Sequence, residues 1–291
     1  MKDKSGNDII ELQLYVGGEH TIKYKYRPET NTASEKLTDE QLLAIVRAAV
    51  SSGIHRFTLI GDDTLQREGI AKLTQKIKAT EGVEKLAFAT NGSGLTELAP
   101  IMKEAGADSV HIQLDTLKYT AYSKLVEGGE IDEIIPGINA CVDAGLSPVT
   151  LDVHIFEGIN DTELMDFLQL TFQHKYSIIF RELVGGEGCG FKSVTEDAIR
   201  AKMPALRTTL KEDETLQAGE IEFFKYPIGV GKIGFISPAS HPESAGAGVA
   251  LVDENARLLL NPFDEDGMNL TETDFDEAAL AALMKWKKTG M

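Results

Sequence analysis

Five polar side chains stand at or just beyond the ends of three apolar runs that are typical of buried strands. They are Asp62, Asp63, Thr90, Gln113 and Asp115. Carboxylate, hydroxyl and amide groups exchange hydrogen bonds with polar ligands, and carboxylates also attract cations. If the three runs belong to one barrel of parallel strands, their carboxyl ends surround one mouth and bring these side chains together. The five residues are therefore the candidate binding site.

Each of these residues also has a purely structural explanation. Asp62 and Asp63 can cap the helix that follows them. Thr90 begins a Thr-Asn-Gly segment that is a competent turn in its own right. Asp115 can cap the segment after it. From the sequence alone, both explanations stay open.

The cysteine content limits the metal chemistry of the chain. Only Cys141 and Cys189 are present, and two thiols cannot supply the three or four thiolates of a typical iron–sulfur cluster or structural zinc site. Cys141 is expected on a buried helix face, and Cys189 lies in the Gly-rich segment Gly185–Gly190. That segment lacks the Gly-Lys-Ser/Thr ending of a phosphate-binding loop. We interpret both cysteines as unreactive thiols.

The order of apolar runs and amphipathic segments predicts an α/β fold. Six strands alternate with helices through short connections, which indicates a parallel sheet with helices outside it. Polar residues at nearly every strand end favour an incomplete (βα)6 TIM-like barrel, with a doubly wound open sheet as the alternative. The predicted strands are Glu11–Val16, His55–Ile60, Lys85–Thr90, Ser109–Leu114, Val149–Phe156 and Ser177–Leu183.

The helices have recognisable starts. Thr38 precedes a segment with helical periodicity and Gln41 follows three residues later, which is the signature of a capping box. Further helices are expected near residues 66–80, 97–105, 132–144 and 161–174, the last of them capped by Asp161.

The pattern changes after about residue 190, so we divide the chain into a partial barrel, 1–190, and a C-terminal α+β extension, 191–291, that covers the barrel. The predicted elements of the extension are a helix at Thr195–Leu210, short strands at Ile221–Tyr226, Lys232–Ile236, Gly248–Val252 and Ala256–Leu260, and a last helix at Asp274–Lys288.

Composition excludes some classes of protein. The 291 residues carry a formal net charge of −17, which disfavours binding to nucleic acid or to an anionic membrane surface. No run of about 18 apolar residues is present, and the first residues lack the apolar stretch of a signal peptide. We expect a cytoplasmic protein.

Six segments, taken in order, resemble those of one enzyme family: LQLYV its first strand, TLIGDDTLQR its second strand and GGEP loop, ATNGSGL its TNG turn, VHIQLDTL its fourth strand, EGINDTEL its GVND turn, and KIGFISPASHP the approach to its second cluster. The chain is similar to the radical SAM family, and specifically to the GTP 3′,8-cyclases of molybdenum-cofactor biosynthesis. The likeness covers nearly the whole chain. It implies the barrel predicted above, two iron–sulfur clusters and S-adenosylmethionine.

The resemblance breaks where the family holds its first cluster, in a C-x3-C-x2-C run after the first strand. The matching positions are His20, Tyr24 and Arg27 or, in a register one residue earlier, Glu19, Lys23 and Tyr26. Neither set contains a thiol, and an arginine cannot be deprotonated to serve as a ligand. The site of the second cluster also lacks its thiols, since its cysteine positions correspond to Ser244, Ala247 and Asn261. We expect no metal site and no 4Fe-4S cluster.

The resemblance also implies that the triphosphate site has lost its charge. Positions that are basic in the family correspond here to Gln13, Thr150, Glu157, Ile179, Val249 and Leu251. Arg181 is the one nearby substitute. Each charge-assisted hydrogen bond to phosphate is worth on the order of 1.5–3 kcal/mol, so several losses would remove most of the recognition of GTP.

What the resemblance leaves intact is the end of the barrel that meets S-adenosylmethionine. Asp63 corresponds to a carboxylate that accepts from the ligand's ammonium group, Thr90 and Asp115 are retained, and Gln113 replaces a serine. With Asp62 these form the candidate cofactor-binding set, without catalytic residues or metal ligands. No cofactor is expected beyond residual binding of S-adenosylmethionine or S-adenosylhomocysteine.

We interpret the chain as a degenerate member of this family, a non-catalytic protein that binds a small molecule or a partner protein. Two alternatives stay open. The chain can be an enzyme that uses the old barrel cavity without a cluster, or it can still be a GTP 3′,8-cyclase, as the family resemblance alone would name it.

Overall fold

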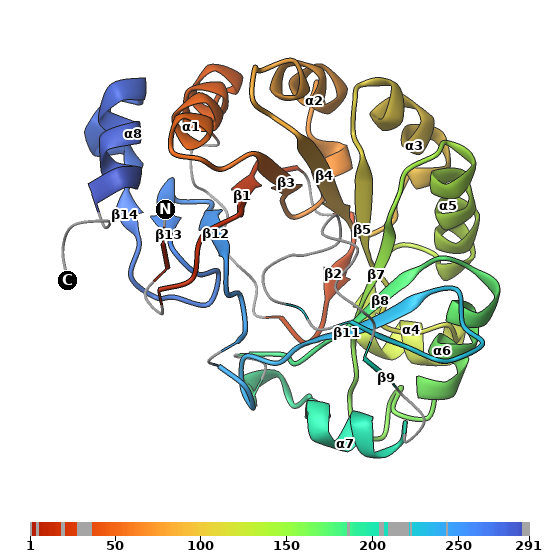
Figure 1. The fold of residues 1–291 in the computed structure, drawn as a ribbon. Coiled ribbons are helices and arrows are strands. Elements are labelled where there is room, and N and C mark those ends of the chain that lie inside the picture. The colour runs from red at the N-terminus through yellow and green to blue at the C-terminus, as the bar shows by residue number, and fades with distance from the viewer. Residues whose placement is uncertain are drawn as a thin grey trace.

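The computed structural model describes residues 2–3, 6–18, 21–27, 37–184, 187–203, 207–208, 221, 223–242 and 244–286. Its centre is a curved sheet with helices on the convex side (Figure 1). Six strands come from the first two thirds of the chain: β1 (Glu11–Tyr15), β3 (Arg56–Ile60), β4 (Lys85–Thr90), β5 (Ser109–Gln113), β7 (Val149–His154) and β8 (Ser177–Arg181). All six predicted strands are therefore present.

Each of these strands pairs in parallel with the previous one, in the order β1-β3-β4-β5-β7-β8. The order never reverses, whereas a doubly wound sheet reverses at a switch point. This confirms the incomplete barrel and excludes the alternative. The carboxyl ends of all six strands consequently point to the same end of the sheet.

Helices cross back outside the sheet between the strands. They are α1 (Asp39–Ser51), α2 (Ile70–Lys78), α3 (Leu95–Glu104), α5 (Ile131–Asp143) and α6 (Leu164–Gln173), with the short α4 (Tyr119–Leu125) near the mouth. The core lies between them and the sheet. All six residues of β7 are buried, as expected for a strand covered on both faces.

The predicted start of α1 is confirmed. The Thr38 hydroxyl accepts from the Gln41 backbone N–H, and the Gln41 side chain accepts from the Thr38 backbone N–H. The predicted cap of α6 is wrong, because Glu163, not Asp161, precedes that helix. The Glu163 carboxylate instead reaches across to the loop after β5, where it accepts from the Thr116 hydroxyl and the Leu117 backbone N–H.

The C-terminal part extends the sheet at both edges. Strand β11 (Lys232–Ile236) pairs in parallel with β8, and β12 (Val249–Val252) pairs in parallel with β1. Antiparallel strands continue outward from each: β10 (Phe224–Lys225) and β9 (Arg207–Thr208) on one side, β13 (Arg257–Leu259) and β14 (Met268–Asn269) on the other. The extension thus shares one sheet with the barrel that it was predicted to cover.

Two further helices complete the fold. Helix α7 (Glu196–Ala201) is shorter than the predicted segment Thr195–Leu210, part of which lies outside the described residues. Helix α8 (Glu277–Trp286) packs beside α1, where Glu277 forms an ion pair with Arg47. Among the described residues, no helix has the length and apolar character needed to cross a membrane.

Candidate functional site

A cavity of about 550 Å³ opens at the carboxyl ends of the strands. Its size suits a small organic ligand, and its place is the one that barrels use for binding. Polar and apolar side chains both line it. The lining side chains with carboxyl, guanidinium, imidazole or amide groups are those of Glu11, Gln13, Arg27, Asp62, Asn91, His111, Gln113, Asp152, His154, Arg181 and Glu182.

Three of the five candidate residues line this cavity, namely Asp62, Thr90 and Gln113. Asp63 and Asp115 are 1% and 4% exposed and lie behind the wall. Asp63 stands at the N-cap position of the short 3₁₀ helix Thr64–Gln66, but its side chain makes no capping hydrogen bond there. Asp115 caps no helix, because Lys118 precedes α4. The five side chains do gather at one mouth, and the structure divides them into a lining set and a supporting set.

Asp63 supports the cavity wall from behind, on the side away from the cavity. Its Oδ2 accepts from the Thr21 hydroxyl at 2.6 Å and its Oδ1 from the Thr90 hydroxyl at 3.4 Å. Burial raises the pKa of this carboxyl group, and the bond from Thr21 opposes the rise. The loop after β1 approaches so closely that a Cβ on Gly18, at φ +118°, would lie 1.8 Å from the Asp63 carbonyl oxygen. Asp62, whose Oδ2 accepts from the Tyr15 hydroxyl at 2.7 Å, is the carboxylate that reaches the cavity.

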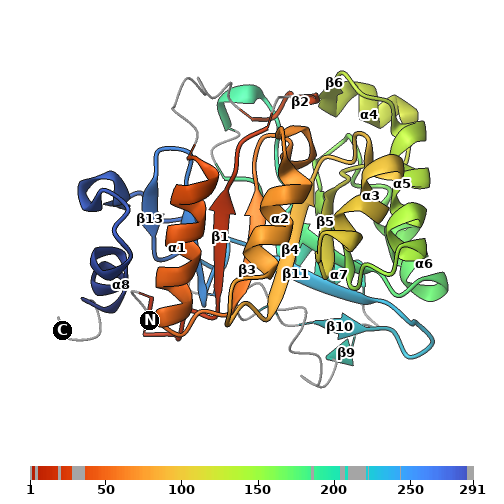
Figure 2. The same cartoon turned by 90° about the horizontal axis from the view of Figure 1, so that it is seen from above.

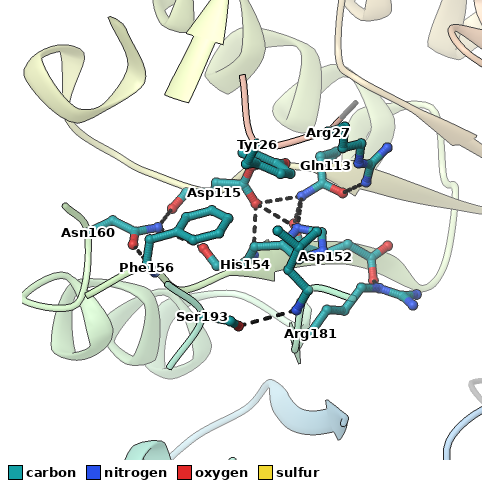
Figure 3. Close-up of polar contacts among 11 residues, drawn as sticks. Tyr26, Arg27, Gln113, Asp115, Asp152, His154, Phe156, Asn160, Arg181 and Ser193 are labelled. Atoms are coloured by element: carbon teal, nitrogen blue, oxygen red, sulfur yellow. Dashed lines mark hydrogen bonds and ion pairs between the residues drawn. The ribbon is translucent and has the colours of Figure 1, made fainter. Parts of the chain in front are cut away.

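Asp115 is the centre of a buried polar network (Figure 3). Its Oδ2 accepts from the Tyr26 hydroxyl at 2.5 Å, and its Oδ1 accepts from the Gln113 amide at 2.5 Å and from the His154 backbone N–H at 2.8 Å. Burial lowers the pKa of His154, although the Asp115 carboxylate opposes the change. With its lone pairs occupied by protein donors, Asp115 fixes the side chains of the wall.

The turn after β7 ties this network to the backbone. Asn160 is fully buried, and its amide nitrogen donates to the carbonyl oxygens of Asp115 at 2.5 Å and of His154 at 2.7 Å. Its amide oxygen accepts from the Phe156 backbone N–H. One side chain therefore holds the ends of β5 and β7 in register, which explains the asparagine in this turn.

A second network lies deeper in the cavity. Arg181 Nε donates to Asp152 Oδ1 at 2.5 Å, and His111 Nδ1 lies 3.2 Å from Asp152 Oδ2. Burial acts to raise the pKa of Asp152, but the positive charge of Arg181 and the contact with His111 outweigh it and hold that pKa well below its ordinary value. Asp152 is therefore ionised at neutral pH.

Glu11 lies near the start of β1 and faces the same cavity. Its Oε1 accepts from the Thr58 hydroxyl at 2.7 Å. Burial raises the pKa of Glu11, and the bond from Thr58 opposes this only in part. The floor of the cavity thus carries a carboxyl group that is more readily protonated than an exposed glutamate.

The loop after β1 lies over the mouth. Its strand β2 (Lys23–Tyr24) pairs with β6 (Val126–Glu127), at the end toward which β1 points (Figure 2). Tyr26 is fully buried, with its ring 4.8 Å from Phe156 and 5.3 Å from His154 between centroids. Of the alternative cluster positions, Glu19 and His20 lie outside the described residues.

Comparison with known proteins places the chain in a family. A sequence profile described as the radical SAM superfamily matches residues 20–171, just over half of the chain. The chain belongs to the radical SAM superfamily. The GTP 3′,8-cyclase of Heliobacterium modesticaldum is 35% identical over 250 residues, covering 82% of this chain and 76% of that relative. That of Alkaliphilus oremlandii is 33% identical over 71% of this chain, but the match spans 64% of its length.

Solved structures agree on the fold. SuiB of Streptococcus suis, bound to S-adenosylmethionine, superposes with a TM-score of 0.65 at 12% identity, covering 96% of this chain and 66% of that one. The hydrogenase maturase HydG superposes with a TM-score of 0.53 over 66% of this chain. Membership of the superfamily and homology to GTP 3′,8-cyclases confirm the sequence resemblance.

The comparisons overturn one expectation. The sequence led us to expect neither a 4Fe-4S cluster nor any cofactor beyond residual S-adenosylmethionine, and this expectation is wrong, because the family to which the chain belongs uses both. The acidic mouth fits the ammonium group of S-adenosylmethionine. The described positions Tyr24, Tyr26 and Arg27 do not fit a cluster held by three thiolates: Tyr26 bonds to Asp115, and the Arg27 guanidinium lies over the Tyr24 ring at 5.1 Å. No reaction step follows from these side chains.

Sequence reasoning missed His111, Asp152, His154 and Glu11 as parts of the site. A signal for them was present. His111 and Gln113 in β5, and Asp152 and His154 in β7, occupy alternate positions of otherwise apolar strands, so they share the inner face. Polar residues at alternate positions of a buried strand indicate a lined cavity.

Proposed function

We propose that this chain is a small-molecule-binding protein of the radical SAM superfamily, related by descent to the GTP 3′,8-cyclases, which holds S-adenosylmethionine or S-adenosylhomocysteine in the barrel cavity without converting GTP. The observation that carries the proposal is the open cavity of about 550 Å³ with Asp62 at its mouth and a fixed polar wall behind it. The homology supports a role connected with molybdenum-cofactor biosynthesis.

The mouth supports recognition of an ammonium group. Asp62 is placed by Tyr15, and Thr90 and Asn91 line the same wall. A charge-assisted hydrogen bond contributes on the order of 1.5–3 kcal/mol. A few such contacts, less the free energy of immobilising the ligand, correspond to a dissociation constant in the high micromolar range.

The charge of the wall disfavours GTP. The carboxyl groups that line the cavity are Glu11, Asp62, Asp152 and Glu182, whereas the guanidinium groups are Arg27 and Arg181, and Asp152 already pairs with Arg181. A triphosphate needs several cationic donors. S-adenosylmethionine, with a sulfonium and an ammonium against one carboxylate, meets this wall with a net positive charge.

The internal bonding of the wall supports a binding role over a catalytic one. Tyr26 and Gln113 each donate a hydrogen bond to the Asp115 carboxylate. Groups held in this way position a ligand, but they are not poised to exchange protons with it.

Titration by NMR tests the binding. S-adenosylhomocysteine at millimolar concentration should shift resonances of β4 and of the loop after β3 in the wild-type protein. Asp62→Asn should weaken the affinity about tenfold, the value of one charge-assisted bond. Asp197→Asn, at a side chain that is 81% exposed on α7, is the matched control and should leave the affinity unchanged. If no resonance shifts, the proposed ligand class is wrong.

A turnover assay tests the non-catalytic role. The protein is reconstituted anaerobically with iron and sulfide, and then incubated with GTP, S-adenosylmethionine and a reductant. We expect no 5′-deoxyadenosine and no cyclised nucleotide above the protein-free control. If mass spectrometry detects either product, the chain is better explained as a GTP 3′,8-cyclase.

A further inference from the structure

A histidine in the deeper part of the cavity has one ring nitrogen engaged and the other open. His111 lines the cavity from β5, and its side chain is 17% exposed. Its Nδ1 lies 3.2 Å from Asp152 Oδ2, and Arg181 Nε donates to the other oxygen of that carboxylate at 2.5 Å (Figure 3). An ionised carboxylate only accepts hydrogen bonds, so in the neutral ring Nδ1 carries the hydrogen and Nε2 a lone pair. No residue in the described part of the chain bonds to Nε2, and the ring is therefore an oriented proton acceptor.

Glu11 supplies a proton donor to the same region. It reaches the cavity from β1, and among the described residues only its Oε1 has a partner, the Thr58 hydroxyl at 2.7 Å. Burial raises the pKa of this carboxyl group, whereas the bond from Thr58 and a positive charge on His111 lower it. Glu11 therefore holds its proton more firmly while the histidine is neutral and releases it more readily once the histidine is protonated. This coupling has the direction that concerted proton transfer requires.

The strands between these two groups leave room for a substrate. Strand β4 lies between β3 and β5, and its Ala89 is in register with His111 and also lines the cavity. A methyl group is the only side chain that this position places between β3 and β5. The floor therefore stays open from Glu11 on β1 to His111 on β5.

The charge of the lining favours a neutral substrate. Its carboxyl and guanidinium groups are those of Glu11, Asp62, Asp152, Glu182, Arg27 and Arg181. Asp152 offsets Arg181, and the Glu182 carboxylate accepts from the backbone N–H groups of Ala239 and Ser240. Even with Glu11 protonated, the remaining carboxylates outnumber the guanidinium groups. An anionic substrate such as a phosphate ester is therefore disfavoured.

We infer that His111 and Glu11 form a proton-transfer site for a small neutral carbonyl compound with a hydrogen on the carbon beside the carbonyl group, and that Asp152 is the positioning residue. His111 Nε2 takes that proton, the C–H electron pair forms a carbon–carbon double bond, and the carbonyl oxygen receives the proton of Glu11. The reverse steps return a proton to carbon, so the outcome is hydrogen exchange or isomerisation without any oxidant, reductant or co-reactant. The inference goes beyond the proposed function, because it adds acid–base chemistry that needs neither a radical nor the Asp62 mouth.

Hydrogen exchange in D₂O measures this activity directly. The probe is dihydroxyacetone, whose hydroxymethyl hydrogens exchange through the enediol, and proton NMR follows their loss in the absence of S-adenosylmethionine. The wild-type protein should exceed protein-free buffer, and His111→Gln should lower the protein-dependent rate about a hundredfold. Glu11→Gln keeps a hydrogen-bond donor but cannot give up a proton, so it should lower the rate about tenfold. His174→Gln, at an exposed ring stacked on Tyr176, is the matched control and should leave the rate unchanged.

Asp152→Asn separates positioning from a merely structural role. Arg181 can only donate, so it keeps the asparagine oxygen toward itself and leaves the amide NH₂ facing His111. Nδ1 must then accept, the ring hydrogen moves to Nε2, and the cavity loses its proton acceptor. In protein labelled with ¹⁵N-histidine, in mildly alkaline buffer, NMR correlations should show Nδ1–H in the wild type and Nε2–H in the variant. The exchange rate should fall about a hundredfold with the change of tautomer.

Either readout can overturn the inference. A wild-type exchange rate equal to that of buffer contradicts it, and so does a rate that His174→Gln lowers as much as His111→Gln. An Nε2–H tautomer of His111 in the wild-type protein also contradicts it, and this result does not depend on the folding of any variant. Binding of S-adenosylhomocysteine is measured separately, so failure of the proton-transfer site leaves the proposed function standing.

Discussion

Asp152 shows how one residue can dominate the electrostatics of the cavity. It is 6% exposed, and its charge persists because Arg181 and His111 face it. Breaking a buried ion pair from one side costs about 3–5 kcal/mol. The Arg181 side chain is a quarter exposed, so solvent screening reduces that figure.

We predict that Asp152→Asn lowers the free energy of unfolding by about 2 kcal/mol at pH 7. A carboxyl group with a lowered pKa in the folded state stabilises above its unfolded pKa, and this contribution is lost as the pH falls through the folded value. The difference in the free energy of unfolding between Asp152→Asn and the wild-type protein should therefore become smaller below about pH 4. Urea unfolding from pH 7 to pH 3 measures it.

Asp166→Asn is the control for this prediction. Asp166 pairs with Lys118 on the surface, with half-exposed side chains, so the variant should change stability by less than about 0.5 kcal/mol. A gap for Asp152→Asn that stays constant or widens in acid would contradict the assignment of a lowered pKa.

Part of the site was predictable residue by residue. Asp62, Thr90 and Gln113 line the cavity because strand ends in a barrel converge. The sequence does not say that Asp63 turns inward to Thr21, since both Asp62 and Asp63 follow the same strand and only the path of the loop separates them. Tyr26 escaped notice as a partner of Asp115 for the same reason.

At the scale of elements, the contact between the loops after β1 and β3 shapes the mouth. Gly18 has φ +118° and lies against the backbone of Asp63, and a Cβ on Gly61 would lie 2.0 Å from the Gly17 carbonyl oxygen. Two chain segments can approach this closely only without side chains. The approach places Asp62 at the cavity and Asp63 behind it.

Gly18→Ala should therefore destabilise the protein by about 3 kcal/mol or more, because it adds a clash to an unfavourable backbone conformation. Gly158→Ala is the matched control. Gly158 has φ +71° and no atom within 4 Å of the added Cβ, so it carries only the conformational cost of about 1–2 kcal/mol. Chemical denaturation measures both, and equal effects would show that the backbone approach is looser than described.

The elements themselves were largely predictable, whereas their partners were not. The capping box of Thr38 and the buried runs of the six strands are local signals. The pairing of β2 with β6 joins residues about a hundred positions apart, and two-residue strands carry no pattern that identifies a partner.

At the scale of the molecule, the C-terminal part belongs to the barrel sheet. The sequence predicts the short strands now seen as β11 and β12, but it does not predict that they pair with β8 and β1 at opposite edges. Long-range pairing of short strands depends on the finished fold, so the sequences of these strands carry no local signal of their partners.

The fragment 1–190 should consequently fail to fold cooperatively, because it leaves β1 and β8 as long open edges. Circular dichroism melts should show no sharp transition. A fragment 1–276, which lacks α8 but keeps every strand of the sheet, is the control and should melt cooperatively at a lower temperature than the full chain. A cooperative melt of fragment 1–190 would restore an independent barrel domain.

The most direct measurement of the central claim is a crystal structure of the protein grown with S-adenosylhomocysteine. The account predicts ligand density in the barrel cavity, with the amine within hydrogen-bond distance of Asp62 and the wall of Gln113 and Asp115 unmoved. A cavity that stays empty at millimolar ligand, or a ligand bound elsewhere on the surface, would contradict it.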